Sequence, residues 1–147
     1  MARNVIFDER FGPSLPIVTV QGEPSDAEVR GFLTRSELAY SAKVPYAAVF
    51  VLEKLTTLSM AQRRSIAAHL REHRSELQEL CVGQAYVMSS VLARMILRTI
   101  FSIQPQPAPW TIVSEVNSGI QYCVQRLRLS GLEVPADALS LISAPSD

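Results

Sequence analysis

The sequence predicts an α/β domain with a mixed, mostly parallel sheet of four or five strands flanked by helices. Residues 46–52 (YAAVFVL) form an unbroken apolar run, which is typical of a short strand covered on both faces. Residues 59–80 then show helical periodicity, with one apolar side made of Ile66, Leu70, His73, Leu77 and Leu80. Strand-like and helical segments alternate in the rest of the chain. The predicted element order is ββαβαβαβα, and alternation of this kind favours parallel strands joined by crossover helices.

The first two strands are predicted at residues 4–9 and 15–21, where Gly12 and Pro13 supply the turn between them. An antiparallel hairpin therefore opens the chain. A helix follows, because Ser25 and Glu28 have the spacing of a capping box. This helix ends by residues 43–45, since the residue before a proline avoids helical angles.

Three more elements follow the central strand and helix. Residues 82–88 predict a fourth strand, Val91–Ile103 a helix capped by Ser89 or Ser90, and Trp110–Val113 a short fifth strand. The last helix begins near Ser114 and stops at Gly131. We therefore expect a single domain over residues 1–131. Residues 132–147 have few large apolar side chains and two prolines, which predicts a loosely docked or disordered tail.

Composition narrows the classes of function. The 147 residues are 48% hydrophobic, enough for a core, and 14 basic residues balance 14 acidic ones. A net charge of zero provides no global field to attract nucleic acid, so we expect no nucleic-acid partner. No run reaches the ~18 apolar residues of a membrane span, and the first ten residues lack an apolar signal core. Cys81 and Cys123 fall at apolar positions as expected for buried thiols. A cytoplasmic protein is the expectation.

The element order, the GEPSDAE helix start, the VFVLE strand and the SMAQRRSIAAHLREH helix together resemble the anti-sigma-factor-antagonist (STAS) fold, in particular small stand-alone bacterial STAS-like proteins. The resemblance covers roughly residues 4–129. It implies a protein-binding or switch module without catalysis. In that family a serine at the start of the helix after the central strand can be phosphorylated, which releases the partner.

The matching region in this chain is residues 55–60 (LTTLSM). It places Ser59 at the position of the regulated serine, with Thr56 and Thr57 as other phosphoacceptors in the loop. The aspartate and glycine of the family's pattern are absent here. A serine at this point also has a structural role as the helix N-cap, worth ~1 kcal/mol. A phosphate there would lie at a helix N-terminus near Arg63.

His69 and His73 match the H-x-x-E-H pattern of inverted zinc peptidases. Histidines four apart share a helix face, as two zinc ligands must. No third ligand is evident in the sequence, so we expect no metal and no other cofactor. The alternative is packing, with His73 half-buried on the apolar side and His69 at its edge. Nucleophile elbows and glycine-rich phosphate loops are also missing, and we expect no enzyme.

The helix Val91–Ile103 is apolar around most of its circumference, and only Arg94, Arg98 and Ser102 form a polar strip. Packing on one sheet face needs a stripe a little over ~100° wide. Leu92, Ile96, Ile100 and Ile103 suffice for that stripe, so Leu97 and Phe101 fall beside it, next to the arginines, and some cover over them is expected. Three kinds of cover remain open: another part of the chain, a second protein chain, or an apolar ligand.

The sequence therefore favours a non-enzymatic protein–protein interaction module of a bacterial regulatory or scaffolding complex, with itself or another protein as partner. The predicted binding surface is Arg94, Leu97, Arg98 and Phe101, and Ser59, Thr56 and Thr57 are the candidate phosphorylation sites. The alternative is a carrier that holds a lipid or other apolar small molecule between helices and sheet. A hydrolase ranks third.

Overall fold

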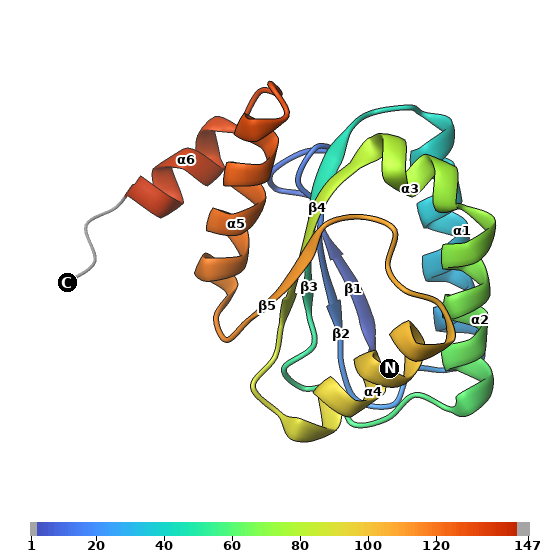
Figure 1. Ribbon diagram of the computed structural model, residues 1–147. Helices are drawn as coiled ribbons and strands as arrows, with labels where there is room; N and C mark the ends of the chain where they lie inside the picture. The colour runs from blue at the N-terminus through green and yellow to red at the C-terminus, as the bar shows by residue number, and fades with distance from the viewer. Residues whose placement is uncertain (1–2, 144–147) are drawn as a thin grey trace.

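A five-stranded sheet separates two unequal layers of helices in the computed structural model, which describes residues 3–143 (Figure 1). Helices α1 to α4 cover one face, and α5 and α6 lie on the other. The elements in chain order are β1 (Val5–Asp8), β2 (Ile17–Val20), α1 (Asp26–Ser41), β3 (Tyr46–Val51), α2 (Met60–Glu72), α3 (Arg74–Leu80), β4 (Cys81–Val87), α4 (Val91–Ile103), β5 (Trp110–Val113), α5 (Val116–Leu129) and α6 (Ala136–Ser143).

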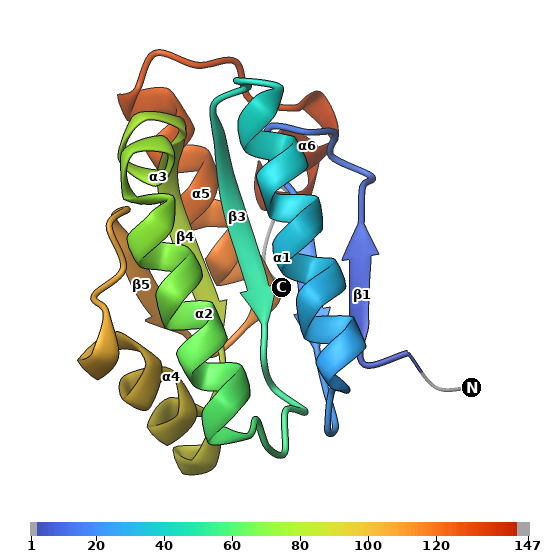
Figure 2. The ribbon, with the colours of Figure 1, turned by 90° about the vertical axis from the view of Figure 1, so that its right-hand side faces the viewer.

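The strands lie in the sheet in their chain order, β1-β2-β3-β4-β5. Strands β1 and β2 are antiparallel, whereas β2 to β5 are parallel. Because each crossover steps to the next strand in the same direction and keeps the same hand, its helices all fall on one face of the sheet. Figure 2 shows this layer, with α1 and α2 side by side in front of the strands. The predicted mixed, mostly parallel α/β sheet is confirmed.

Strand β3 is the central strand, as its continuous apolar sequence predicts. Ala47 and Val49 are buried in a cluster with α5, while Ala48 and Phe50 face the α1–α2 side. The α5 layer lies close to the sheet because Gly119 has no side chain. A Cβ at Gly119 would come within 3.2 Å of Val49 Cγ1. Glycine in this helix therefore sets the spacing of the α5 layer.

Local capping chemistry explains most helix boundaries. Ser25 with Glu28 begins α1 and Ser59 with Gln62 begins α2, each as a complete capping box. Ser90 Oγ accepts the Ala93 N–H at the start of α4. Gly131 follows α5 in the left-handed conformation, at φ 73°. These caps were predicted, apart from the choice of Ser90 over Ser89.

The helix predicted over residues 59–80 is wrong in one respect, since the structure divides it at His73. The backbone leaves helical angles there, at φ −106° and ψ 25°, and α3 starts at Arg74. No proline or glycine marks the site. The ring of His73 lies beside Tyr40 and Glu37 of α1, with its centroid 5.2 Å from that of Tyr40.

The segment after Gly131 also differs from the predicted loose tail. It contains α6, which packs on α5, and Ala138 is fully buried in the cluster of the α5 layer. Residues 144–147 of the predicted tail lie outside the described residues. Within residues 3–143, no helix combines the length and the apolar character needed to cross a membrane.

Substitution of Ala138 tests whether α6 contributes to folding. Ala138→Asp buries a carboxylate without a partner and should lower the free energy of unfolding by more than 1 kcal/mol, on the order of a buried polar defect. Ala136→Asp is the matched control, because Ala136 is exposed in the same helix. Equal urea midpoints for the two variants would contradict the docking of α6.

Candidate functional site

The loops that follow β3 and β4 form one continuous surface at the carboxyl edge of the sheet. The two strands are adjacent and parallel, so both loops leave at the same edge (Figure 2). The Leu52 N–H donates to Val87 O over 2.8 Å. Ser89 Oγ donates to a carboxylate oxygen of Glu53 and joins the two loops. The β3–α2 loop and the start of α4 are thereby held together.

Ser59 lies in the first of these loops and acts as the predicted cap of α2. Its Oγ accepts the Gln62 N–H over 3.0 Å, and Gln62 Oε1 accepts the Ser59 N–H over 2.9 Å. Gln62 Nε2 also donates to Asp26 Oδ1 over 2.9 Å, which ties the starts of α1 and α2 together. The cap is therefore part of a link between two helices.

The three candidate phosphoacceptors differ in access. Ser59 and Thr56 are exposed, and Thr57 is half-buried. Ser59 and Thr57 share a surface hollow with the carboxylates of Glu23 and Asp26. A phosphate in this hollow would meet like charge. Arg63, the expected counter-charge, donates its Nε–H to Leu58 O over 2.8 Å.

Helix α4 is rotated relative to the sequence prediction. The buried side consists of Ala93, Ile96, Leu97 and Ile100. Leu97, which the sequence places beside the buried stripe, is itself part of the buried side and only 6% exposed. Phe101 is half-buried, with its ring centroid 5.0 Å from that of Trp110 and 5.7 Å from that of Tyr86. Because α4 is apolar nearly all round, several of its sides could be buried at similar free energy. In the structure, the side that packs against α2 and the sheet differs from the predicted one.

The rotation exposes other apolar side chains beside the two arginines. Val91 is 73% exposed, Met95 57% and Leu92 49%. Arg94 and Arg98 are exposed, as predicted. Methionine and arginine are both enriched at protein interfaces, and the exposed aliphatic side chains add apolar area beside them. We call this surface the α4 outer face, defined by Val91, Leu92, Arg94, Met95, Arg98 and Ile103.

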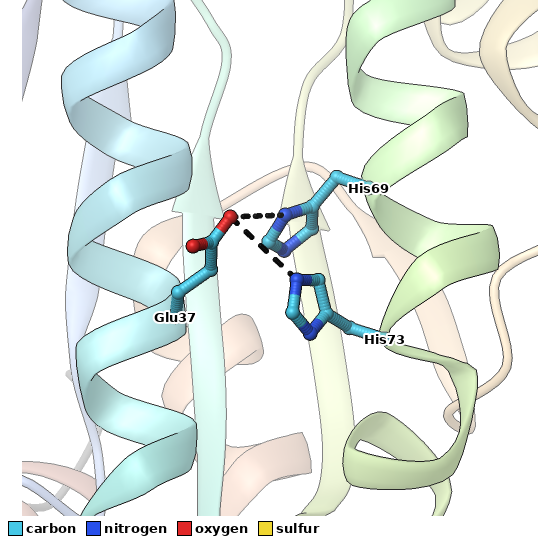
Figure 3. Close-up of side chains that lie close together, drawn as sticks. All are labelled: Glu37, His69 and His73. Atoms are coloured by element: carbon cyan, nitrogen blue, oxygen red, sulfur yellow. Dashed lines mark ion pairs between the residues drawn. The ribbon is translucent and has the colours of Figure 1, made fainter.

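A second group of polar side chains lies between α1 and α2 (Figure 3). Glu37 of α1 points toward the rings of His69 and His73, with its Oε1 4.0 Å from His69 Nδ1 and 3.6 Å from His73 Nε2. His69 is 7% exposed, so its predicted edge position is wrong, whereas His73 is half-buried as expected. Sequence reasoning missed Glu37, because only the packing of α1 on α2 brings it to the histidines.

Burial determines the protonation of His69. Loss of solvation and, to a smaller extent, the neighbouring His73 lower its pKa from 6.5 to about 4, against opposing effects of Glu37 and Glu76. The ring is therefore neutral at pH 7. The Tyr40 hydroxyl is hydrogen-bonded to His69 Nε2 over 3.0 Å. Nδ1 is then the ring nitrogen directed at Glu37.

A cavity of about 590 Å³ is lined by residues of the sheet and of α1, α2 and α4. A row of aromatic side chains lines it, with Phe32 of α1 between Phe7 of β1 and Phe50 of β3 at centroid distances of 6.2 and 6.0 Å. Tyr40 and His69 also line it, so the cavity reaches the histidine cluster. Its size and lining are those of a site for an apolar small molecule.

Removal of the Ser59 hydroxyl tests its capping role. Ser59→Ala should lower the free energy of unfolding by about 1 kcal/mol, whereas Ser59→Asn should keep most of it, because asparagine also caps and adds no charge beside Glu23 and Asp26. Thr56→Ala is the control, since no hydrogen bond of the Thr56 side chain occurs within residues 3–143. The capping role is refuted if urea denaturation gives the same loss for Ser59→Ala and Thr56→Ala.

His69 should make stability depend on pH. Its folded-state pKa of about 4 lies below the ordinary 6.5, so the unfolded chain binds one more proton between these values. The stability that neutral His69 contributes is complete above about pH 6.5 and decreases as the pH falls to 4. The free-energy difference between wild type and His69→Gln, from urea unfolding, should shrink across this window. A constant difference would exclude the pKa shift.

Comparison with known proteins supports the fold. No protein-family model matches the sequence, and no curated protein does. Among solved structures, an anti-sigma factor antagonist from Mycobacterium paratuberculosis superposes with a TM-score of 0.55 at 13% identity, over 81% of this chain and 92% of that one. An uncharacterized DUF3478-family protein from Shewanella loihica, described as having a SpoIIAA-like fold, gives a TM-score of 0.57 at 12% identity, over 84% of this chain and 98% of that one.

At these identities the likeness concerns the architecture. The mixed sheet of this chain, with β1 and β2 antiparallel and the other strands parallel, agrees with the fold resemblance seen in the sequence. This chain has a STAS-like fold.

Proposed function

We propose that this protein is a non-enzymatic protein-binding module of a bacterial regulatory or scaffolding complex. The α4 outer face, with the adjoining β3–α2 loop, is its binding surface. The supporting fold neighbour is an anti-sigma factor antagonist, a regulator named for its action on another protein. The proposal places the module in the cytoplasm and takes as partner a second protein or a second copy of this chain.

The exposure of Val91, Leu92 and Met95 is the observation that carries this proposal. A Val, Leu or Met side chain left in water forfeits ~1.5–3 kcal/mol of burial energy. Three of them fall on one helix, next to two exposed arginines, at the edge of the sheet where the Ser59 loop also lies. A partner that covers this face gains apolar burial and finds Arg94 and Arg98 at its rim.

Modification of the loop would regulate this contact in our proposal. Ser59 and Thr56 are accessible to a kinase, and a phosphate on either adds negative charge beside the binding surface. At Ser59 that charge would also share the hollow with Glu23 and Asp26. Like-charge repulsion there would loosen the link between α1 and α2 that Gln62 makes to Asp26.

A photo-crosslinking amino acid at position 95 tests the surface. In cells, it should crosslink to one defined protein, or to a second copy of the chain. The same amino acid at position 129 of α5 should give no such product, because Leu129 is exposed too, at 70%, but α5 lies across the sheet. Leu92→Glu with Arg94→Glu, which leaves position 95 free for the probe, should abolish the crosslink at an unchanged urea midpoint, since both side chains are exposed.

The identified partner, copurified with wild type and with Leu92→Glu/Met95→Glu, gives the second readout. Retention of the complex by this double variant would reject the α4 outer face as the binding surface. Leu97→Ala is the control for folding. It should lose about 2–5 kcal/mol of stability as a buried leucine, without a direct effect on the contact.

The second candidate function is a carrier for a lipid or another long apolar molecule, and the cavity beneath α1 favours it. Its volume of about 590 Å³ lies in the range of ligand pockets, and its aromatic row suits an acyl chain. Arg35 lies at the outer end, with its guanidinium 3.8 Å from the Phe7 ring centroid. Arg35 already pairs with the Glu9 carboxylate, so an anionic headgroup would have to displace Glu9 to use this charge.

A fluorescent fatty-acid analogue measures this activity. The wild type should bind it in a saturable manner, and Ala48→Phe, which fills space beneath α1, should weaken binding at least about tenfold while the protein stays folded. A clean unliganded mass in native mass spectrometry, together with absent binding of the analogue, would eliminate the carrier.

A further inference from the structure

We propose that Glu37, His69 and His73 form a binding site for one divalent first-row transition-metal ion, with Zn²⁺ as the representative ion. The site is independent of the protein-binding surface on α4. It joins α1, through Glu37, to the α2–α3 junction, through the two histidines (Figure 3).

The ligand set suits zinc and its neighbours. Two imidazole nitrogens and one carboxylate oxygen are the donors of many three-ligand zinc sites, with a fourth position left for water. The histidines lie four residues apart around α2, which directs both rings to one side of the helix. Within residues 3–143, these are the metal-ligating side chains that converge as a group of three, all with ligand atoms within 4.8 Å of one another.

The distances are those of a site slightly wider than its bound form. Metal–ligand bonds of about 2.0–2.2 Å in a tetrahedron place ligand atoms about 3.3 Å apart. Glu37 Oε1 is 3.6 Å from His73 Nε2 and 4.0 Å from His69 Nδ1. These separations exceed a hydrogen bond. The three groups thus face one another without direct hydrogen bonds, and small side-chain movements bring them to metal-binding distances.

The ring nitrogens of His69 and His73 that do not face Glu37 also have polar partners suited to a metal site. A metal-binding imidazole usually donates its other N–H to a polar partner, which holds the ring in place. His69 has the Tyr40 hydroxyl at 3.0 Å from Nε2 for this purpose. His73 has Glu76 Oε1 at 3.6 Å from Nδ1, and this Nδ1 is a buried atom without a hydrogen bond. Metal at His73 Nε2 would place the proton on Nδ1, where a small shift lets Glu76 accept it.

Two ordinary ion pairs, from Glu37 to His69 and from Glu37 to His73, account for this geometry less well than a metal site does. Glu37 Oε1 lies 3.6 Å from His73 Nε2 and 4.0 Å from His69 Nδ1, so the carboxylate faces both rings without a hydrogen bond to either. Glu37 is half exposed, which leaves an entry path for the ion from solvent.

Metal binding would stabilise the attachment of α1. Val29 and Tyr40 are the buried residues of this 16-residue helix, and the cavity lies beneath it. A metal bridge from Glu37 to the histidines would hold the helix to α2. Because Tyr40 and His69 also line the cavity, the same ion would restrain its wall.

Zinc titration of the chelator-treated full-length protein tests the proposal. Competition with a chromophoric chelator should give one Zn²⁺ per chain, and zinc should raise the thermal unfolding midpoint. Glu37→Gln keeps the shape of the side chain but removes the ligand charge, and it should weaken binding by at least about tenfold. His73→Gln should do the same, whereas His69→Ala is less informative because the ring is buried.

Glu72→Gln is the matched control. Glu72 is an exposed carboxylate on the same helix, between the two histidines in sequence, and its removal should leave zinc affinity unchanged. Co²⁺ should give the visible spectrum of nitrogen and oxygen ligands. Three results would each overturn the proposal: no competition with the chelator, equal losses in Glu37→Gln and Glu72→Gln, or a thiolate–cobalt band that assigns the ion to Cys81 or Cys123.

Discussion

The burial of β3 on both faces is the constraint on which the rest of this structure depends. Ala47 and Val49 face one helical layer and Ala48 faces the other, so the strand has no solvent side. Continuous apolar sequence is stable only where both faces are covered. The right-handed crossovers supply one cover with α1 to α4, and α5 has to supply the other. The placement of the helices thus follows from the burial of β3 on both faces and from the right-handedness of the crossovers.

The two layers cover the sheet differently. On the α5 side, Gly119 lets the helix approach the sheet closely and the interior is filled. On the other side, α1 lies over an aromatic row and a cavity of about 590 Å³. Glu37, His69 and His73 form a polar cluster between α1 and α2 in this same layer. The proposed sites for a small molecule and for an ion therefore both lie on the α1–α2 side of the sheet.

Helix α4 links this packing to the proposed protein contact. Burial of Leu97 together with Ala93, Ile96 and Ile100 uses one side of a helix that is apolar nearly all round. The side chains left over, Val91, Leu92 and Met95, are then necessarily exposed. The α4 outer face exists because α4 has more apolar side chains than one buried side can hold. Which of these side chains are exposed depends on the rotation of the helix.

The sequence by itself determined the order of elements, the central strand, the caps at Ser25 and Ser59, and the stop at Gly131. These features depend on period, turn chemistry and hydrogen bonds a few residues apart, which are local. Only the tertiary structure decided which side of α4 is buried, that α6 docks through Ala138, that the chain breaks at His73, and that Glu37 meets the histidines. Each of these depends on the fit between elements distant in the chain. An apolar helix offers several faces of nearly equal burial energy, and a carboxylate on another helix leaves no periodic signal near its partners.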